Sequence, residues 1–186
     1  MRDFELLGLL YASGSVKLGK GHRIEFQTKR EEFSEIVFSR LIEFGKARIK
    51  KGKAIEVSLS QKEEVEGLLK KIGLSLPFDK EKLPTEALDT SEKRRAFLRG
   101  FFEGKSSVSS QKRLIKVSGG VEQLEGLKKL LALEGVMSGI YSTGKYKSLY
   151  IQGKMRCESF MKIGFLSKEK NNMLDETTTF GKWRKF

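Results

Sequence analysis

The chain has 186 residues, of which 38% are hydrophobic and 33% charged, and it carries a formal net charge of +13 at pH 7. This composition is typical of a soluble globular protein with one sizeable core or two small ones, and it excludes a disordered chain. A single cysteine, Cys157, excludes a disulfide framework, and with only His22 beside it the chain lacks the soft ligands of a zinc site.

The first part of the chain predicts three helices separated by two β-hairpins. The first helix is apolar on nearly all sides, which indicates burial, and the strands alternate apolar with polar residues. A serine followed by acidic residues predicts the N-cap of the third helix. In chain order the expected elements are a helix over residues 2–11, a hairpin over 15–29, a helix over 30–45, a hairpin over 46–60 and a helix over 60–73 capped by Ser60.

The same order of elements returns in the second part of the chain. A stretch that contains both prolines lies between the two parts and is typical of a linker. The C-terminal stretch ends in the basic and aromatic letters GKWRKF. The expected elements of the second part are a helix over residues 92–103, a hairpin over 106–118, a helix over 121–134, a hairpin over 138–152 and a helix over 154–163.

Three short sequences recur at nearly one offset, which indicates a duplicated unit. Gly8 and Gly100 are 92 positions apart, the letters GK recur after 92 positions at 52 and 144, and the letters KIG recur after 91 positions at 71 and 162. We therefore expect an α+β protein built from two pseudo-symmetric αββαββα repeats, each with a four-stranded antiparallel sheet. The expected domains are a first repeat over residues 1–75, a linker over 76–91, a second repeat over 92–166 and a C-terminal basic tail over 167–186.

Each opening helix carries two small residues one turn apart, Gly8 with Ala12 and Gly100 with Gly104. Residues four apart share one helix face, so these pairs would let two helix backbones approach closely. We expect the two helices to pack through these faces and to form the interface between the repeats. The alternative is two unrelated buried helices with incidental glycines.

Both opening helices resemble one known motif. Residues 6–14, LLGLLYASG, and residues 98–106, LRGFFEGKS, are similar to the nine-letter motif of the LAGLIDADG homing endonucleases in their single-chain, two-repeat form. The resemblance implies that the motif helices form the interface between the repeats and that two sheets form a saddle over the major groove of DNA. It also implies an acid at the eighth letter of each motif, which holds Mg²⁺ for two-metal cleavage of opposed phosphates.

The eighth letters of this chain are Ser13 and Lys105, and neither is an acid. A lone hydroxyl is a poor magnesium ligand, and an ammonium places a positive charge where the cation would lie. Glu103 lies two residues before Lys105, which turns it about 200° around the helix, so we expect it at the rim or in a polar contact with the other repeat. We accordingly expect no catalytic residue, no metal site and no cofactor. Lys105 is interpreted either as a cation that contacts a phosphate or as a product of drift.

The charge favours a polyanionic partner, with nucleic acid first and an anionic membrane surface second. The alternative is a lysine-rich surface that only keeps the protein soluble. Strand alternation predicts which polar side chains face the ligand, and lysines at the hairpin tips are expected to contact phosphates. The expected nucleic-acid-binding residues of the first repeat are Lys17, Lys20, Arg23, Gln27, Lys29, Arg48, Lys50 and Lys53. Those of the second repeat are Lys112, Arg113, Lys116, Tyr141, Lys145, Lys147, Tyr150 and Gln152.

The function expected from these features is double-stranded DNA binding by a monomer without nuclease activity. Two alternatives remain open: an RNA-binding, maturase-type splicing cofactor, and an active endonuclease that binds Mg²⁺ through unconventional ligands. The sequence lacks an apolar run that could span a bilayer and a signal-peptide pattern, so the expected location is the cytoplasm.

Overall fold

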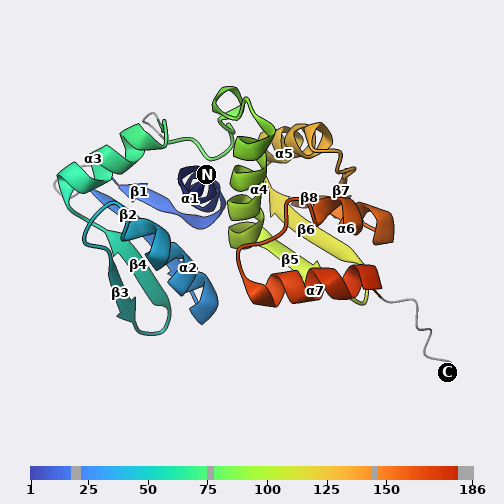
Figure 1. Ribbon diagram of the computed structural model, residues 1–186, viewed down its shortest axis with the longest axis horizontal. Helices are drawn as coiled ribbons and strands as arrows, with labels where there is room; N and C mark the ends of the chain where they lie inside the picture. The colour runs from blue at the N-terminus through green and yellow to red at the C-terminus, as the bar shows by residue number, and fades with distance from the viewer. Residues whose placement is uncertain (18–21, 75–77, 144–145, 180–186) are drawn as a thin grey trace.

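The structure is a computed structural model, and it describes residues 1–17, 22–74, 78–143 and 146–179. Two central helices separate a first half from a second half, as Figure 1 shows on either side of the α1–α4 pair. The elements of the first half are α1 (Arg2–Ser13), β1 (Ser15–Lys17), β2 (Arg23–Thr28), α2 (Glu31–Leu41), β3 (Arg48–Lys51), β4 (Ile55–Leu59) and α3 (Lys62–Lys71).

The second half repeats this order after a short 3₁₀ turn, η1 (Thr85–Ala87), and adds one further helix. Its elements are α4 (Ser91–Lys105), β5 (Ser106–Ser109), β6 (Leu114–Gly119), α5 (Val121–Leu133), β7 (Gly139–Thr143), β8 (Tyr146–Gln152), α6 (Lys154–Phe160) and α7 (Lys168–Thr179). The α+β class and the two αββαββα units are therefore confirmed. Among the helices that the structure describes, none combines the length and apolar character needed to cross a bilayer.

Each half contains a four-stranded antiparallel sheet, with the strand orders β1-β2-β4-β3 and β5-β6-β8-β7. On one face of each sheet, alternate apolar residues are buried beneath helices, for example Ile24 and Phe26 of β2 and Leu149 and Ile151 of β8. Because side chains alternate along a strand, the intervening polar residues lie on the opposite face of each sheet. The predicted alternation in these strands is confirmed.

The duplication extends to the ends of the helices. Gly73 and Gly164, which close the two KIG sequences, have positive φ angles of 68° and 66°. Residues with side chains rarely adopt this left-handed conformation, so glycine is favoured at both positions. The repeat therefore preserves a backbone requirement as well as an order of elements.

Two predicted helix boundaries are wrong. Ser60 does not cap α3, because β4 continues to Leu59 and the helix begins at Lys62 with Gln61 at the N-cap position. The second helix, expected to end at Gly45, ends at Leu41, where the chain tightens into a turn with the Phe44 N–H bonded to the Leu41 carbonyl at 3.0 Å.

The C-terminal segment differs most from its prediction as a basic tail. Residues Lys168–Thr179 form α7, which packs on α6 and β5 and buries Lys170, Leu174, Thr177 and Thr178. The helix has acidic as well as basic residues, and its buried positions make it part of the second half. The GKWRKF letters lie outside the described residues.

Candidate nucleic-acid interface

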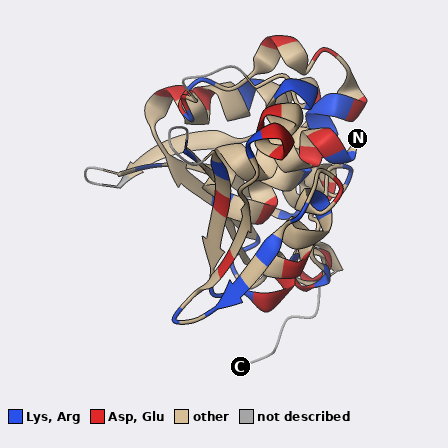
Figure 2. Ribbon diagram, turned by 90° about the vertical axis from the view of Figure 1, so that its left-hand side faces the viewer, with Lys and Arg blue, Asp and Glu red and all other residues tan. Residues whose placement is uncertain are grey.

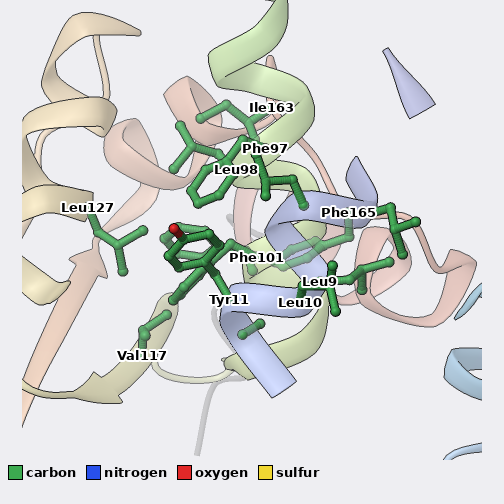
Figure 3. Packing of buried hydrophobic residues seen from close by; sticks show 14 of the residues in the cluster. Leu9, Leu10, Tyr11, Phe97, Leu98, Phe101, Val117, Leu127, Ile163 and Phe165 are labelled. Carbon is green, nitrogen blue, oxygen red and sulfur yellow. The ribbon is translucent and has the colours of Figure 1, made fainter. Parts of the chain in front are cut away.

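The helices α1 and α4 cross through the predicted small residues. A Cβ atom at Gly8 would overlap the carbonyl oxygen of Phe97, and a Cβ atom at Gly100 would overlap the carbonyl oxygen of Glu5. Around this crossing, Leu9, Leu10 and Tyr11 of α1 lie beside Phe97, Leu98 and Phe101 of α4 (Figure 3). The close approach positions the two halves, and therefore the two sheets, relative to one another.

The crossing also brings the C-terminal ends of the two helices together. A Cβ atom at Gly104 would stand 2.7 Å from the Ala12 Cβ and 3.1 Å from the Ser13 Oγ. The Ser13 Oγ is buried and has no hydrogen-bond partner among the described residues. The first of the two eighth-letter positions therefore faces the end of the opposite motif helix.

Lys105, at the second position, has a neutral partner. Its Nζ donates to the Gln123 Oε1 at 2.5 Å, and the buried Gln123 in turn donates from Nε2 to the Lys80 carbonyl at 2.6 Å. Burial lowers the pKa of Lys105, against the opposing charge of Glu81 and together with the like charge of Lys80. The ammonium is thus held half-buried beside the start of α5.

Ser13 and Lys105 do not form a binding site for a magnesium ion. Magnesium takes oxygen ligands, chiefly carboxylates, whereas the two helix ends present one hydroxyl and one ammonium. Within the described ranges, no group of three or more His, Cys, Asp or Glu residues is placed so that it could hold a metal. Glu103, the nearest acid of the second motif, points away from Ser13 and Lys105, toward Arg30 and Ser167.

Glu103 is fully buried and joins the two halves. Its Oε1 accepts from Arg30 of the first half at 2.9 Å, and its Oε2 accepts from the Leu166 and Ser167 N–H groups at 3.2 and 3.0 Å. The Ser167 hydroxyl donates to the same oxygen at 2.9 Å. The polar contact with the other half that the sequence predicts for Glu103 is therefore present.

Lys170 of α7 completes this cluster, and no pattern in the sequence indicates its role. Its Nζ donates to the carbonyls of Phe102, Glu103 and Ser106 at 3.0, 2.7 and 2.8 Å. Burial lowers the pKa of Lys170 to about 8, so the amine is still protonated at neutral pH. A cation at the C-terminal end of α4 is favoured by the helix dipole, and it donates to carbonyls of the last turn and of the cap residue.

Replacing Lys170 with methionine is expected to lower the free energy of unfolding by about 1–2 kcal/mol, because three carbonyls at the end of α4 lose a charged donor. The matched control is Lys168→Met, which removes an exposed lysine from the same helix. Chemical denaturation of both variants checks the prediction. Equal stability of the two variants would contradict a capping role for Lys170.

The outer face of the first sheet is charged but partly self-neutralised. Arg23 pairs with Glu56 and, at 3.3 Å, with Glu25, which also lies 3.5 Å from Lys17. Burial raises the pKa of Glu25, but the hydrogen bond from Gln27 and the charges of Lys17 and Arg23 outweigh it and lower that pKa overall.

Two other basic residues of this face remain available. Arg48 and Lys50 of β3 are exposed, and neither has an acidic partner within 4 Å in the described part of the chain. Figure 2 shows basic and acidic residues interspersed over strands and helices alike, so charge alone does not single out one face. The strand register identifies the outer face of the first sheet. The basic side chains of this face that lack an acidic partner, Arg48 and Lys50, lie on β3.

The outer face of the second sheet carries hydroxyl and aromatic groups. The Lys116 Nζ lies 5.7 Å from the centroid of the Tyr150 ring, and Tyr150 packs against Tyr141 with centroids 5.3 Å apart. The Ser118 and Ser148 hydroxyls are hydrogen-bonded at 2.8 Å. Four of the predicted binding residues, Lys116, Tyr141, Tyr150 and Gln152, share this face by register.

The predicted tip residues lie in several environments. Lys29 and Lys53 are exposed beside the first sheet, and Lys112 and Arg113 form the β5–β6 turn, where Arg113 has a φ angle of 45°. Lys147 is exposed, but its register with Gly119 and Ser142 places it on the helix-covered side of β8. Lys51 likewise turns toward the helices and donates to Glu31 of α2 at 2.6 Å. Lys20 and Lys145 lie outside the described residues.

Comparison with known proteins gives one family match. Residues 92–164 match a family model described as a LAGLIDADG-like domain. No curated protein is significantly similar to the chain in sequence.

Several solved structures share the fold over most of the chain, across both halves. The structure of I-DmoI in complex with DNA and Mn has a TM-score of 0.65 at 16% identity, with 87% of this chain and 95% of that chain covered. I-DmoI in complex with DNA and Ca gives the same score and identity over 92% of this chain and 96% of that one. Full-length DUF199/WhiA from Thermatoga maritima has a TM-score of 0.62 at 19% identity, over 97% of this chain and 62% of that one. The TM-scores show a common fold, and at these low identities they show the fold alone.

Proposed function

We propose that this LAGLIDADG-like protein binds double-stranded DNA with the outer faces of its two sheets and does not cleave the DNA that it binds. The observation that carries the proposal is the strand register, which places Arg23, Gln27, Arg48, Lys50 and Lys116 on the faces that the helices leave open. The fold is shared with I-DmoI, whose structures contain DNA. The formal charge of +13 adds a long-range attraction to a polyanion.

Within this proposal, the contacts divide between phosphates and base edges. Exposed lysines at strand ends, such as Lys53, suit phosphate oxygens, whereas arginine and glutamine in mid-strand can form paired hydrogen bonds with base edges in the major groove. Both halves of the surface come from a single chain, so we propose that the protein binds as a monomer.

The helix ends support binding without cleavage. In the family that the motif resembles, acids at the two eighth-letter positions hold the Mg²⁺ that cleavage requires, and here these positions are Ser13 and Lys105. Lys105 donates to a neutral glutamine, and the Ser13 hydroxyl faces Gly104. A half-buried ammonium at this point repels a divalent cation and attracts a phosphate oxygen.

A gel shift on a pool of random DNA duplexes in Mg²⁺ tests both parts of the proposal on one gel. Retarded, uncut DNA is the expected result. Cut DNA would mean that other ligands hold the metal, and it would overturn the second part of the proposal. DNA that is neither retarded nor cut would overturn the first part and favour the RNA alternative.

Replacing Lys50 with alanine is expected to weaken duplex binding several-fold and to reduce the salt dependence by about one ion per complex, because one phosphate contact is lost. Lys128→Ala is the matched control, since Lys128 is an exposed lysine on α5, in the helix layer. Binding is measured by fluorescence anisotropy over a series of salt concentrations. The same loss in both variants would show that only net charge matters and would contradict the assigned face.

A further inference from the structure

The two outer sheet faces are equivalent by position but not by chemistry. The strand pairings place residues of three neighbouring strands side by side, β2, β4 and β3 in the first sheet and β6, β8 and β7 in the second. These rows of the two halves correspond at the repeat offset of 91 or 92 positions. The row Glu25, Ser58 and Arg48 corresponds to Lys116, Tyr150 and Gly139, and the row Gln27, Glu56 and Lys50 corresponds to Ser118, Ser148 and Tyr141. Aromatic residues of the second sheet thus stand where the first sheet has Ser58 and Lys50.

Gly139 determines how the Tyr141 ring lies. A Cβ atom at Gly139 would stand 2.7 Å from the Tyr141 Cε2 and 2.9 Å from its hydroxyl oxygen, so the ring lies across the glycine. In this position it packs against Tyr150 at a ring angle of 44°, while Lys116 lies over the Tyr150 ring. The ring is folded down onto the sheet rather than extended from it.

The aromatic surface remains open to solvent. Tyr141 is 52% exposed despite its contact with Tyr150, and Tyr146, on the same face of β8, is 78% exposed. Exposed aromatic rings beside a cation offer two kinds of contact at once, a π-face for a planar ring and a positive charge for an anion. A nucleotide carries both of these groups, as a base and a phosphate.

Fully paired DNA does not use such a surface well. In a duplex, each base is stacked on its neighbours and presents only its edges to the grooves. A ring folded onto a sheet presents its face, which can stack only on a base that has left the helix. A surface of this kind therefore distinguishes unpaired from paired nucleotides.

We propose that Tyr141, Tyr150 and Lys116 form a stacking site for an unpaired nucleobase, so that the preferred ligand is a duplex interrupted by an unpaired nucleotide. The site rests on the proposed function, because the first sheet is taken to hold the adjoining duplex. Lys116 lies where it can neutralise the phosphate of the stacked nucleotide. The unpaired base can belong to a bulge in DNA or in RNA, since both present the same π-face.

The test compares the affinity for a fluorescein-labelled DNA duplex, for the same duplex with a short bulge, and for a bulged RNA duplex of the same sequence. The wild-type protein is expected to bind the bulged DNA about tenfold more tightly than the paired DNA, a factor typical of one base stacked on an aromatic ring. The bulged RNA arm reports which nucleic acid the site prefers, and a preference for bulged over paired probes supports the site in either case.

Variants separate stacking from the flexibility of a bulge. Tyr141→Ser is expected to abolish the preference for the bulge, whereas Tyr141→Phe is expected to keep it. Gly139→Ala is expected to reduce the preference by displacing the ring, whose far end can rotate away without disturbing the sheet, and circular dichroism checks that this variant is folded. Lys50→Ala, at the position equivalent to Tyr141, is expected to weaken binding to paired and bulged probes alike.

Equal affinity of the wild-type protein for paired and bulged probes would overturn the stacking site and leave the proposed duplex binding intact. An equal loss on both probes in Tyr141→Ser would overturn it as well. Failure of every probe to bind would overturn both proposals. Binding to bulged probes without binding to the paired duplex would support the stacking site and contradict the proposed function.

Discussion

Replacing Gly100 with alanine is expected to lower the free energy of unfolding by about 2–3 kcal/mol, although alanine is the better helix former. The Cβ atom would overlap the Glu5 carbonyl oxygen and stand 2.9 Å from the Glu5 carbonyl carbon. These are backbone atoms that cannot rotate away, so α1 and α4 must separate within the core. Overpacking typically costs about 1–3 kcal/mol and occasionally more, and a clash with immovable backbone lies at or above the upper end, at about 3–4 kcal/mol. About 2–3 kcal/mol therefore remains after the gain of about 1 kcal/mol in helix propensity.

Gly67 offers a control in which the same substitution should have the opposite sign. It lies inside α3, and a Cβ atom there would meet no atom within 4 Å. Gly67→Ala is therefore expected to raise the free energy of unfolding by about 0.5–1 kcal/mol. Urea denaturation of both variants measures the difference. A Gly100→Ala protein as stable as wild type would mean that the two helices can separate at no cost, against the role assigned to their crossing.

The helix crossing was predictable because its cause is local in the sequence. Two small residues one turn apart mark a helix face without large side chains. This pair occurs in both opening helices at the repeat offset, so each helix indicates the other as its packing partner. The same reasoning extends to Gly73 and Gly164, since both have a positive φ angle at a helix end. Because the pattern is duplicated, a pair of small residues that would be weak evidence alone predicts a tertiary contact between two helices.

The cluster around Glu103 was not predictable in detail, because its partners are far apart in the chain. Arg30 precedes Glu103 by 73 residues and Lys170 follows it by 67. A lysine in a charged C-terminal segment has the same local sequence whether it is solvated or buried, so no periodic signal marks Lys170. The helix α7 and its buried lysine were not predicted for this reason, and only the polar contact of Glu103 with the other half was predicted.

The proposed binding face was also predictable only in part. Alternation along each strand predicts which residues share a face, but it says nothing of how the strands are aligned. The contact of Tyr141 with Tyr150 depends on the pairing of Gly139 with Tyr150, which only the register supplies. The difference between a charged first face and an aromatic second face thus becomes visible only when the rows of the two sheets are compared.

Replacing Glu103 with alanine is expected to lower the free energy of unfolding by about 3–5 kcal/mol, the largest effect predicted for this chain. Removing one partner from a set of buried charges leaves the other without compensation, which costs that amount in typical cases. The cation left in this way is the buried Lys170 ammonium, which the charge of Glu103 stabilises. Of its acidic partners in the described part of the chain, Arg30 would keep only Glu169, at 3.6 Å, and the Leu166 and Ser167 N–H groups would lose their acceptor. Urea denaturation measures the loss.

Glu43→Ala is the matched control, because Glu43 pairs with Arg2 at 2.6 Å but the two side chains are 32% and 67% exposed. Its expected cost is below about 1 kcal/mol, since water compensates an exposed pair. The larger loss in Glu103→Ala should also be localised. Leu166 and Ser167 connect α6 to α7, so hydrogen exchange is expected to increase first in α7 and the segment before it. Two outcomes would contradict the proposed role of Glu103 in connecting α7 and the first half to the end of α4. One is a uniform increase of hydrogen exchange over both halves, and the other is a loss of stability no larger than that of Glu43→Ala.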